Sequence, residues 1–378
     1  MRLLFVTPRY GDFAGGAERA ARAFAERCCD GWEVEVATTC AIDHHRWANE
    51  LPVGVEKIGG IPVHRFAVTT RPPVDGIRVR TGGGYIDGVR ALSRSVWSAD
   101  LHRFLVAEAH RFDLILFLPY LFGTSFWGAQ VDPARTVLIP CLHDEPEAYL
   151  TPMRALLGRV RGTIFLSRSE ARLAARLTPL RSPHVVGVGI DSEPPLPPSA
   201  IDAFRVQHGL TRPYVVSVGR IEEGKGVDVL VDLVRRYRAE RGELDLVLVG
   251  HGPYRPPGWV RTLGYLDDSS RRAAYAGARA FVSASRLESF SLVLLEAWSE
   301  RTPGICHRAC GPMAEHVRLA GAGRTYAGFA GFAAAIDAYA DPAVRADAAE
   351  RGRTYVETAY AWPAVRERFR EAIVACAS

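Results

Sequence analysis

The feature that most constrains the fold is a repeated alternation of short apolar runs with longer amphipathic stretches. In the first half the runs predict strands at Leu3–Thr7, Glu33–Thr38, Ile61–Phe66, Leu114–Leu118, Val137–Cys141 and Thr163–Leu166. The second half repeats the pattern, with strands expected at Tyr214–Val218, Leu244–Val249 and Ala280–Ala284. Such alternation is typical of parallel strands joined by helices. The chain is therefore expected to form two successive α/β halves of Rossmann-like type.

Amphipathic stretches between the runs predict the helices. They cover Ala17–Cys28, Val227–Glu240, Ser269–Ala276 and Leu292–Glu300. The last segment, Trp362–Ala375, carries an apolar stripe of Val365, Phe369, Ile373 and Cys376. Because it follows the second half, we expect this helix to cross back and pack on the first.

A proline-rich segment divides the two halves. Residues Ser192–Ser199 contain four prolines, which are incompatible with a helix interior or a central strand. At about 100 to 200 residues per domain, a chain of 378 residues has room for two. We therefore expect a first domain over 1–191, a linker over 192–199, a second domain over 200–358 and a returning helix over 359–378.

Composition excludes several classes of protein. A formal charge of +5 gives no density of charge typical of a nucleic-acid binder. Seven cysteines, an odd number, fit a reducing compartment. The segment Cys306–Cys310 could supply two ligands of a metal site, but no second Cys/His pair at zinc spacing accompanies it. We therefore expect no bound metal. No apolar run reaches about 18 residues, and we expect a soluble, cytoplasmic protein.

Two glycines, Gly15 and Gly16, follow the first expected strand and open a helix. Glycines let the backbone approach a ligand, and free N–H groups at a helix start favour an anion such as a diphosphate. A tight turn is the alternative interpretation. The spacing is not the G-x-G-x-x-G fingerprint of dinucleotide-dependent oxidoreductases.

A second group of residues follows the first strand of the second half, where Arg220 and Lys225 flank a turn. Only two lysines, Lys57 and Lys225, occur among the 47 basic residues. An arginine and a lysine at the carboxyl edge of a sheet suit the neutralisation of a diphosphate. The alternative is a solvated pair bridged to Glu222 and Glu223.

The third group is the segment Ser283–Ala297, in which a strand ends, a loop carries Glu288 and a helix begins near Ser291. Glu296 lies inside that helix within an apolar run, where a carboxylate needs a partner. A helix start beside a carboxylate suits a ligand that has both phosphates and hydroxyls. The alternatives are that Glu288 is only a cap and Glu296 only a partner for Arg301.

Glu288 and Glu296, with seven residues between them, resemble the E-x7-E motif of the retaining glycosyltransferases of family 4. The other segments that resemble the family, in the right order, are Gly15–Glu18, Gly219–Gly226, Gly250–Pro253 and Thr302–Pro303. The resemblance covers essentially the whole chain. It implies the GT-B fold, with two Rossmann-like domains, a cleft between them and a C-terminal helix crossing back to the first domain.

The resemblance also implies roles for individual residues. Arg220 and Lys225 would hold the donor diphosphate, together with backbone N–H groups of Gly15 and Gly16. Glu296 would bind the nucleotide ribose and Glu288 the transferred sugar. His143 matches the family's histidine near the reaction centre. Further donor contacts would come from Gly264, Tyr265, Ser289, Phe290, Ser291 and Leu292.

The reaction implied is metal-independent transfer of a sugar, with retention, from a nucleotide-diphosphate sugar of UDP or GDP type. The acceptor would be a hydroxyl of a glycan, glycolipid or small molecule, and no separate cofactor is required. Electrostatic stabilisation of the leaving diphosphate by Arg220, Lys225 and helix-start amides would replace a metal.

The sequence departs from the family pattern at several positions. Ser289 and Ser291 stand where glycines are more common, Arg301 replaces a glycine and Val188 replaces an asparagine. The chain also passes from Pro253 to Leu263 in barely ten residues, which leaves no room for the family's usual helix. The loop that leads to Gly264 and Tyr265 is therefore expected to differ from the family pattern.

Two alternative functions and two structural questions accompany this interpretation. A GT-B epimerase or phosphorylase would need other acidic, histidine or lysine residues, whereas a non-catalytic partner that regulates another transferase would keep a nucleotide-sugar or glycan site. Arginines of the first half (Arg71, Arg78, Arg80, Arg90 and Arg94) either form a solvated face or contact the inner face of a membrane. The segment Arg71–Tyr85 is either a surface loop or a substrate-ordered lid.

Overall fold

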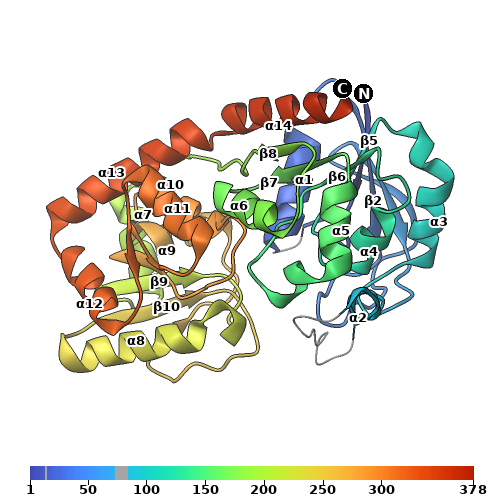
Figure 1. The fold of residues 1–378 in the computed structure, drawn as a ribbon. Helices are drawn as coiled ribbons and strands as arrows, with labels where there is room; N and C mark the ends of the chain where they lie inside the picture. The colour runs from blue at the N-terminus through green and yellow to red at the C-terminus, as the bar shows by residue number, and fades with distance from the viewer. Residues whose placement is uncertain (13–14, 73–83) are drawn as a thin grey trace. The chain divides into compact units, whose positions relative to one another are not determined.

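The computed structural model describes residues 1–12, 15–72 and 84–378, which divide into two compact units. Unit 1 consists of residues 1–189 and 362–378, and unit 2 consists of residues 190–361. Each unit is an α/β layer structure built on a largely parallel sheet (Figure 1). The α/β class expected from the alternating pattern is confirmed.

Within its described residues, unit 1 has an eight-stranded sheet in the order β3-β4-β2-β1-β5-β6-β7-β8. All neighbouring pairs are parallel except β3 and β4. The strands are β1 (Arg2–Val6), β2 (Glu33–Thr39), β3 (Gly54–Ile58), β4 (Ile61–Phe66), β5 (Leu114–Phe117), β6 (Thr136–Leu138), β7 (Gly162–Phe165) and β8 (Pro183–Val185).

The helices of unit 1 are α1 (Gly16–Arg27), α2 (Tyr85–Leu92), α3 (Ala99–Glu108), α4 (Gly123–Gly128), α5 (Thr151–Arg159), α6 (Arg168–Leu177) and α14 (Trp362–Ala377). The C-terminal helix α14 packs against α1, as Figure 1 shows in red and blue. The ring of Phe369 stacks on Phe24 at 4.8 Å between centroids. The apolar stripe expected on this helix is fully buried, which confirms the amphipathic assignment.

Unit 2 has a six-stranded sheet over its residues, in the order β11-β10-β9-β12-β13-β14. All of its pairs are parallel. The strands are β9 (Tyr214–Val218), β10 (Asp245–Val249), β11 (Arg261–Thr262), β12 (Ala280–Ser283), β13 (Gly304–His307) and β14 (Arg324–Tyr326).

Helices cover both faces of the second sheet. They are α7 (Pro198–Gln207), α8 (Val227–Glu240), α9 (Asp268–Ala276), α10 (Leu292–Ser299), α11 (Gly311–Ala320), α12 (Phe329–Ala338) and α13 (Pro342–Ala359). Figure 1 shows α8 on one side of β9 and β10, with α9 and α10 on the other. The side chains of α8 and α12 share one apolar core with the inner strands, in which Val234, Leu246 and Phe332 are buried.

Most bounds agree with the sequence-based expectations to within a single residue, and three differences have a clear structural reason. The strand expected over Val137–Cys141 ends at Leu138, because Pro140 lacks an N–H and Cys141 adopts a left-handed conformation with φ of 52°. The proline-rich segment is not all linker, since Pro198 occupies the first turn of α7, where a missing N–H costs nothing. The final helix begins at Trp362, because α13 continues to Ala359.

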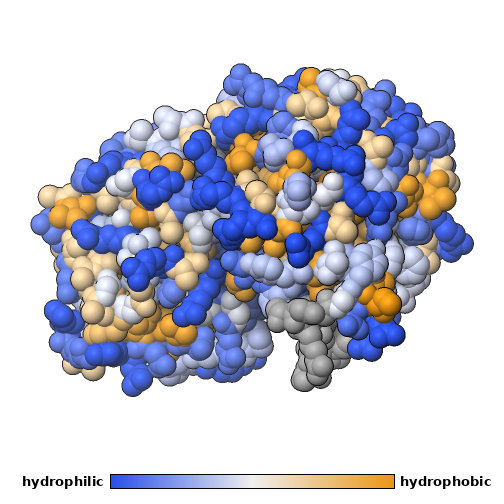
Figure 2. Space-filling model, in the orientation of Figure 1, coloured by the Kyte–Doolittle hydropathy of each residue, from blue (hydrophilic) through white to orange (hydrophobic). Residues whose placement is uncertain are grey.

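The face drawn in Figure 2 is mainly hydrophilic, with apolar side chains in small groups. None of the helices in the described part of the chain is long and apolar enough to cross a membrane. Of the arginines considered for membrane contact, Arg78 and Arg80 lie outside the described residues, as does most of Arg71–Tyr85. Arg71 donates to the carbonyl of Trp47, and Arg90 pairs with Asp87.

Candidate donor-binding site

The framework of the candidate site is the carboxyl edge of the sheet in unit 2, where the segments after β9 and β10 run against each other. The Ile221 N–H donates to the His251 carbonyl at 2.9 Å. A side-chain carbon at Gly250 would lie 2.0 Å from the Gly219 carbonyl oxygen, and one at Gly252 would lie 2.1 Å from that of Ile221. Only glycine therefore permits this approach, which fixes the backbone that carries Arg220.

Arg220 extends from this turn and is half exposed. Its guanidinium contacts the Glu222 carboxylate at 3.1 Å, so the bridge proposed as the alternative interpretation does form. An exposed pair of this kind contributes about 0 to 1 kcal/mol. Arg220 is thus only weakly held and can exchange Glu222 for a stronger anion.

Lys225 instead reaches the loop of the E-x7-E motif. Its Nζ donates to Oε1 of Glu288 at 2.7 Å, and both side chains are mostly buried. Gly226, with φ of 69°, lets the chain turn against the end of β12, where a side-chain carbon would lie 2.7 Å from the Ala284 carbonyl oxygen. Two motifs that are 63 residues apart in sequence are therefore joined directly.

Helix α10 begins beside Glu288 through an unusual residue, Ser291. It adopts a left-handed conformation with φ of 75° and ψ of 70°, which glycine tolerates far better than serine. This accounts for the glycine that the sequence resemblance leads one to expect at this position. The buried Ser291 Oγ has no hydrogen-bond partner among the described residues. A strained residue with an unsatisfied hydroxyl marks this helix start as a functional candidate.

Glu296 lies on the second turn of α10 and is buried, as its apolar neighbours suggest. Tyr275 donates a hydrogen bond to its Oε2 at 3.3 Å, and Arg271 lies 3.9 Å from the same atom. The alternative pairing of Glu296 with Arg301 is wrong, since Arg301 contacts Glu350 at 3.2 Å. Arg301 has φ of 58°, which again places a non-glycine residue at a left-handed position.

The sequence did not predict a group of contacts around His316 that supports the start of α10, which is called the His316 brace below. His316 Nε2 donates to the Phe290 carbonyl at 3.0 Å, and its Nδ1 lies 3.1 Å from the Tyr355 hydroxyl. The Phe290 ring packs edge-on against His316 and Tyr360, each at 5.1 Å. Burial lowers the pKa of His316 to about 4, so the imidazole is neutral at pH 7. These contacts position the Phe290–Leu292 turn.

Gly264 and Tyr265 lie beside the same edge. Gly264 has φ of 67°, and its carbonyl accepts from the Gly250 N–H at 2.8 Å. Tyr265 is 66% exposed, and its ring stands edge-on to His251 at 4.6 Å. No helix forms between Gly252 and Leu263, and a cavity of about 270 Å³ opens there, lined by His251, Tyr254, Arg255 and Pro257 among others.

In unit 1, Gly15 is the N-cap of α1 and Gly16 its first residue, as expected. A side-chain carbon at Gly15 would lie 1.9 Å from Glu18 Oε2. The Glu18 carboxylate accepts from Arg9 Nε at 2.9 Å, and Arg9 also donates to the Ile42 carbonyl at 2.6 Å. Gly15 thus makes room for an ion pair beside the helix start. Nothing in the sequence indicated that Arg9 and Glu18 form an ion pair.

His143 lies on the loop after β6, also in unit 1. Its Nδ1 is 3.6 Å from Glu145 Oε2, and the other oxygen of Glu145 accepts from the buried Tyr120 hydroxyl at 2.7 Å. Glu145 and Tyr120 were missed, although a carboxylate two residues from His143 was a usable signal. The Glu145 carboxylate thus faces the imidazole at a distance too long for a direct hydrogen bond.

A second carboxyl group, that of the buried Glu170, stabilises the loop that carries His143. It accepts from the N–H groups of Leu142 and Leu166, each at 2.6 Å. Burial raises the pKa of Glu170 to about 8, against the lowering effect of these donors. Its place in α6 gave no hint of this role in the sequence.

The structure therefore joins Lys225 to Glu288 and places Arg220, Ser291 and Glu296 on neighbouring elements of unit 2. Ser289, Phe290 and Leu292 belong to the same turn. The participation of Gly15, Gly16 and His143 in one site with these residues stays a prediction. Cys306 and Cys310 are buried, and no group of three or more His, Cys, Asp or Glu side chains in the described residues is placed to hold a metal ion.

Comparison with known proteins gives a consistent picture. Residues 212–341 match the model of the family described as glycosyl transferases group 1. A phosphatidyl-myo-inositol mannosyltransferase of Propionibacterium freudenreichii is 31% identical over 151 residues, or 39% of this chain. A glycogen synthase of Thermus thermophilus is 29% identical over 180 residues, or 45% of this chain. The aligned parts span 38% and 40% of those relatives' own length.

Solved structures resemble the whole chain. A sucrose-phosphate synthase from Thermosynechococcus elongatus aligns with a TM-score of 0.74 and 20% identity, over 99% of this chain and all of that one. Anabaena Alr3699/HepE, in complex with UDP-glucose, aligns with a TM-score of 0.74 and 18% identity over the same shares. WaaG, a glycosyltransferase involved in lipopolysaccharide biosynthesis, gives 0.64 and 15%, covering 98% of this chain and 99% of that one. The fold of this chain is GT-B.

Proposed function

We propose that the protein is a retaining glycosyltransferase that moves a sugar from a nucleotide-diphosphate sugar to a hydroxyl of a glycan, glycolipid or small-molecule acceptor. The observation that carries the proposal is the Lys225–Glu288 ion pair at the carboxyl edge of the unit 2 sheet. This pair brings a candidate phosphate ligand and a candidate sugar ligand to the same point, beside the start of α10. The match of residues 212–341 to a glycosyltransferase family supports the same assignment.

Each residue of the edge has chemistry suited to one part of the donor. Arg220 is exposed and weakly paired, and its planar fork is suited to a phosphate. Lys225 supplies a point charge that a bound diphosphate would share with Glu288. The free N–H groups at the start of α10 add a positive dipole end. Glu296 offers a fixed carboxylate to the hydroxyls of the ribose.

We propose that the chemical step is a front-side displacement. The bond from the anomeric carbon to the diphosphate oxygen breaks as the acceptor oxygen bonds to the same face. The diphosphate leaves with the electron pair, and its leaving oxygen takes the proton of the acceptor hydroxyl. Negative charge grows on the leaving diphosphate, where Arg220, Lys225 and the helix-start amides stabilise it without a metal ion. His143, which faces the Glu145 carboxylate, is proposed to lie near the reacting sugar.

Donor turnover tests the proposal. The donors to try first are UDP-glucose, the ligand named for the HepE structure, and GDP-mannose as the GDP representative. Release of nucleotide diphosphate is measured for the wild type, for Lys225→Met and for Lys57→Met. Lys57 is the only other lysine in the chain and lies on the exposed strand β3, so it is a matched control.

We expect turnover with one donor, a loss of about 100-fold or more in Lys225→Met and no change in Lys57→Met. An α-linked donor should give an α-linked product, measured from the anomeric proton coupling. Equal turnover in the two lysine variants would contradict the donor assignment. Donor binding without turnover, with any acceptor glycan, would favour a non-catalytic partner that regulates another transferase.

We place the reaction in the cytoplasm, where nucleotide sugars are available, with peripheral contact to the inner face of the membrane if the acceptor is a glycolipid. The half-exposed aromatic Tyr85 and the exposed Ile86, beside Arg90 on α2, support such contact. Sedimentation with anionic vesicles tests it. Binding that survives in Arg90→Gln plus Arg94→Gln would argue against an electrostatic role for these arginines.

A further inference from the structure

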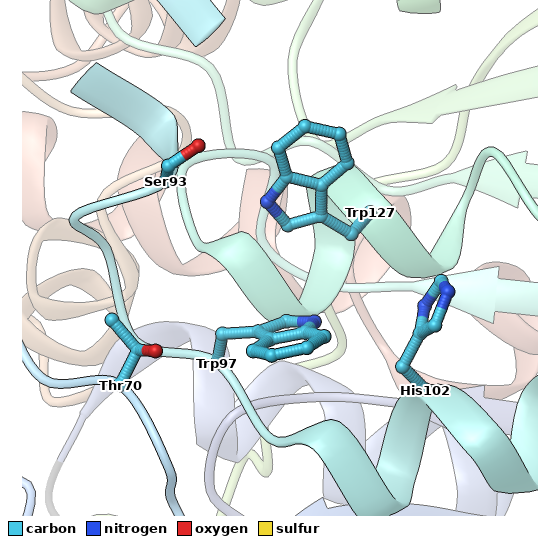
Figure 3. A pocket seen from close by; sticks show the side chains of 5 residues that line it. All are labelled: Thr70, Ser93, Trp97, His102 and Trp127. Carbon is cyan, nitrogen blue, oxygen red and sulfur yellow. The ribbon is translucent and has the colours of Figure 1, made fainter. Parts of the chain in front are cut away.

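Unit 1 holds a cavity of about 290 Å³ that contains none of the residues assigned above. Its walls are Thr70, Ser93, Trp97, His102 and Trp127. Figure 3 shows the two indoles one above the other, with Thr70 and Ser93 on one side and His102 on the opposite side. Ligand pockets measure roughly 300 to 1,000 Å³, so this one is at the lower limit and has room for a single ring.

The cavity lies where α/β sheets bind ligands. Thr70 follows β4, and Trp127 belongs to α4, the helix that follows β5. Trp97 directly precedes α3, whose next strand is β5, so the start of α3 also belongs to the carboxyl edge of the sheet. Segments beyond the carboxyl ends of parallel strands are the usual place for ligands in such folds.

The walls are held in place before any ligand binds. Thr70 and Trp97 exchange two backbone hydrogen bonds, at 3.0 and 3.1 Å. Ser98 caps α3 by accepting from the Leu101 N–H, which fixes the helix that carries His102. Trp127 packs edge-on against the buried Phe126 at 4.8 Å. A preformed pocket binds with little ordering cost.

The lining combines two flat apolar surfaces with polar groups at their edges. One face of a pyranose ring presents C–H groups that pack on an indole, while its hydroxyls need hydrogen-bond partners at the rim. The hydroxyls of Thr70 and Ser93 lie on one side. On the other is His102, whose buried Nδ1 has no hydrogen-bond partner in the described part of the chain. The Ser93 hydroxyl donates to the Val89 carbonyl at 2.9 Å and can still accept a hydrogen bond. An acyl or isoprenoid chain would leave the buried Nδ1 of His102 unpaired, which is costly.

We propose that this cavity binds one sugar residue of a glycan, stacked on Trp97 and Trp127, and that this glycan is the acceptor. The second half of the proposal rests on the proposed glycosyltransferase function. The first half stands on the cavity alone. The acceptor would then be a molecule that already contains at least one sugar residue, in addition to the group whose hydroxyl reacts.

The test is saturation-transfer-difference NMR of the full chain with the methyl glycosides of glucose, galactose, mannose and N-acetylglucosamine. Wild type is compared with Trp97→Leu and with Trp32→Leu. Trp32 is a half-buried tryptophan of the same unit that precedes β2, at the opposite edge of the sheet, and serves as the control. We expect ring C–H signals for at least one glycoside, and an affinity about tenfold weaker in Trp97→Leu only.

A second variant keeps the proposal testable if Trp97→Leu does not fold. His102→Leu removes the polar partner from a partly buried position of α3, and we expect it to weaken glycoside binding about fivefold or more. Circular dichroism in the aromatic region reports whether each variant is folded. Absence of glycoside signals, equal affinity in folded Trp97→Leu and wild type, or binding of decanol in place of every glycoside would overturn the proposal.

The outcomes separate this inference from the proposed function. Donor turnover without any glycoside bound at Trp97 leaves the glycosyltransferase assignment standing and overturns the sugar pocket. Glycoside binding that depends on Trp97, in a protein that binds no nucleotide, supports the pocket and overturns the acceptor assignment.

Discussion

At the scale of single residues, the positions with left-handed backbone conformation show which residue types are set by the backbone and which by side-chain chemistry. Ser291 and Arg301 both have positive φ values, 75° and 58°, at positions where the resemblance to family 4 glycosyltransferases leads one to expect glycine. Backbone conformation alone accounts for a glycine at such a position. Ser291 adds to this strain a buried hydroxyl that has no hydrogen-bond partner among the described residues.

Ser291→Gly is expected to stabilise unit 2 by about 1 kcal/mol, because it removes a strained conformation and an unsatisfied buried hydroxyl. Ser289→Gly is the control, since Ser289 has no positive φ and glycine there only adds flexibility in the unfolded chain. Denaturant unfolding measures both. Destabilisation by Ser291→Gly similar to that by Ser289→Gly would show that Ser291 is not strained.

Glu170 gives unit 1 an unusual dependence on pH. Its pKa is raised to about 8 in the folded chain, against an ordinary value of 4.5. Between these values the folded chain holds a proton that the unfolded chain has lost, so stability should fall as pH rises from about 4.5 to 8. Unfolding midpoints of unit 1 at pH 5 and pH 8 measure this. Glu170→Gln should flatten the difference, and an unchanged slope in that variant would exclude Glu170 as its source.

At the scale of elements, the sequence predicted most of the strands in the two sheets, but few of the contacts that position the loops. Strands such as Tyr214–Val218 and helix Val227–Glu240 carry their own apolar pattern and agree with the structure to the residue. Short edge strands such as β11 and β14 have too few residues for a pattern, and their pairing depends on neighbours distant in sequence.

The candidate site shows the same division. Lys225, Glu288 and Glu296 follow directly from motif spacing. Their partners do not, because the Tyr275 and Arg271 side chains reach Glu296 from another helix. His316 is 26 residues from Phe290 in sequence, and nothing local to either residue indicates their hydrogen bond. Residues that act by positioning others are therefore the ones that sequence patterns leave out.

The His316 brace predicts that the start of α10 loosens in acid. The pKa of His316 is lowered by burial to about 4, from an ordinary 6.5. The unfolded chain binds a proton that the folded chain refuses between these values, so the stability of unit 2 should fall as pH drops from about 6.5 to 4. Hydrogen exchange of residues 288–299, corrected for intrinsic rates, should quicken over this range. In His316→Gln the remaining pH effect should be smaller, and an identical effect would assign it to other groups.

At the scale of the whole molecule, the chain leaves unit 1 at residue 189 and returns to it at residue 362. The returning helix α14 is fixed to unit 1 by Phe369, which stacks on Phe24, and by Arg366, which pairs with Asp30 at 2.7 Å. Unit 1 is therefore complete only when the last segment of the chain is in place.

Phe369→Ala should destabilise unit 1 by about 3 to 5 kcal/mol, because it empties a fully buried site in its core. The surface-exposed Val374→Ala on the same helix should cost less than about 0.5 kcal/mol. Hydrogen exchange of backbone amides in residues 1–189 and in residues 190–361 follows the two units separately. Loss of unit 2 alone in Phe369→Ala would contradict the assignment of α14.

The central claim is that unit 2 holds a nucleotide-sugar donor at Lys225, Glu288 and Glu296. Its most direct test is isothermal titration calorimetry with UDP and GDP, on wild type, Glu296→Gln and Glu300→Gln. Glu300 lies one turn further along, is mostly buried and pairs with Arg272, so it is the matched control. The account predicts binding of one nucleotide, weakened about tenfold or more by Glu296→Gln and unchanged by Glu300→Gln. Binding of neither nucleotide, or equal affinity in wild type and Glu296→Gln, would contradict it.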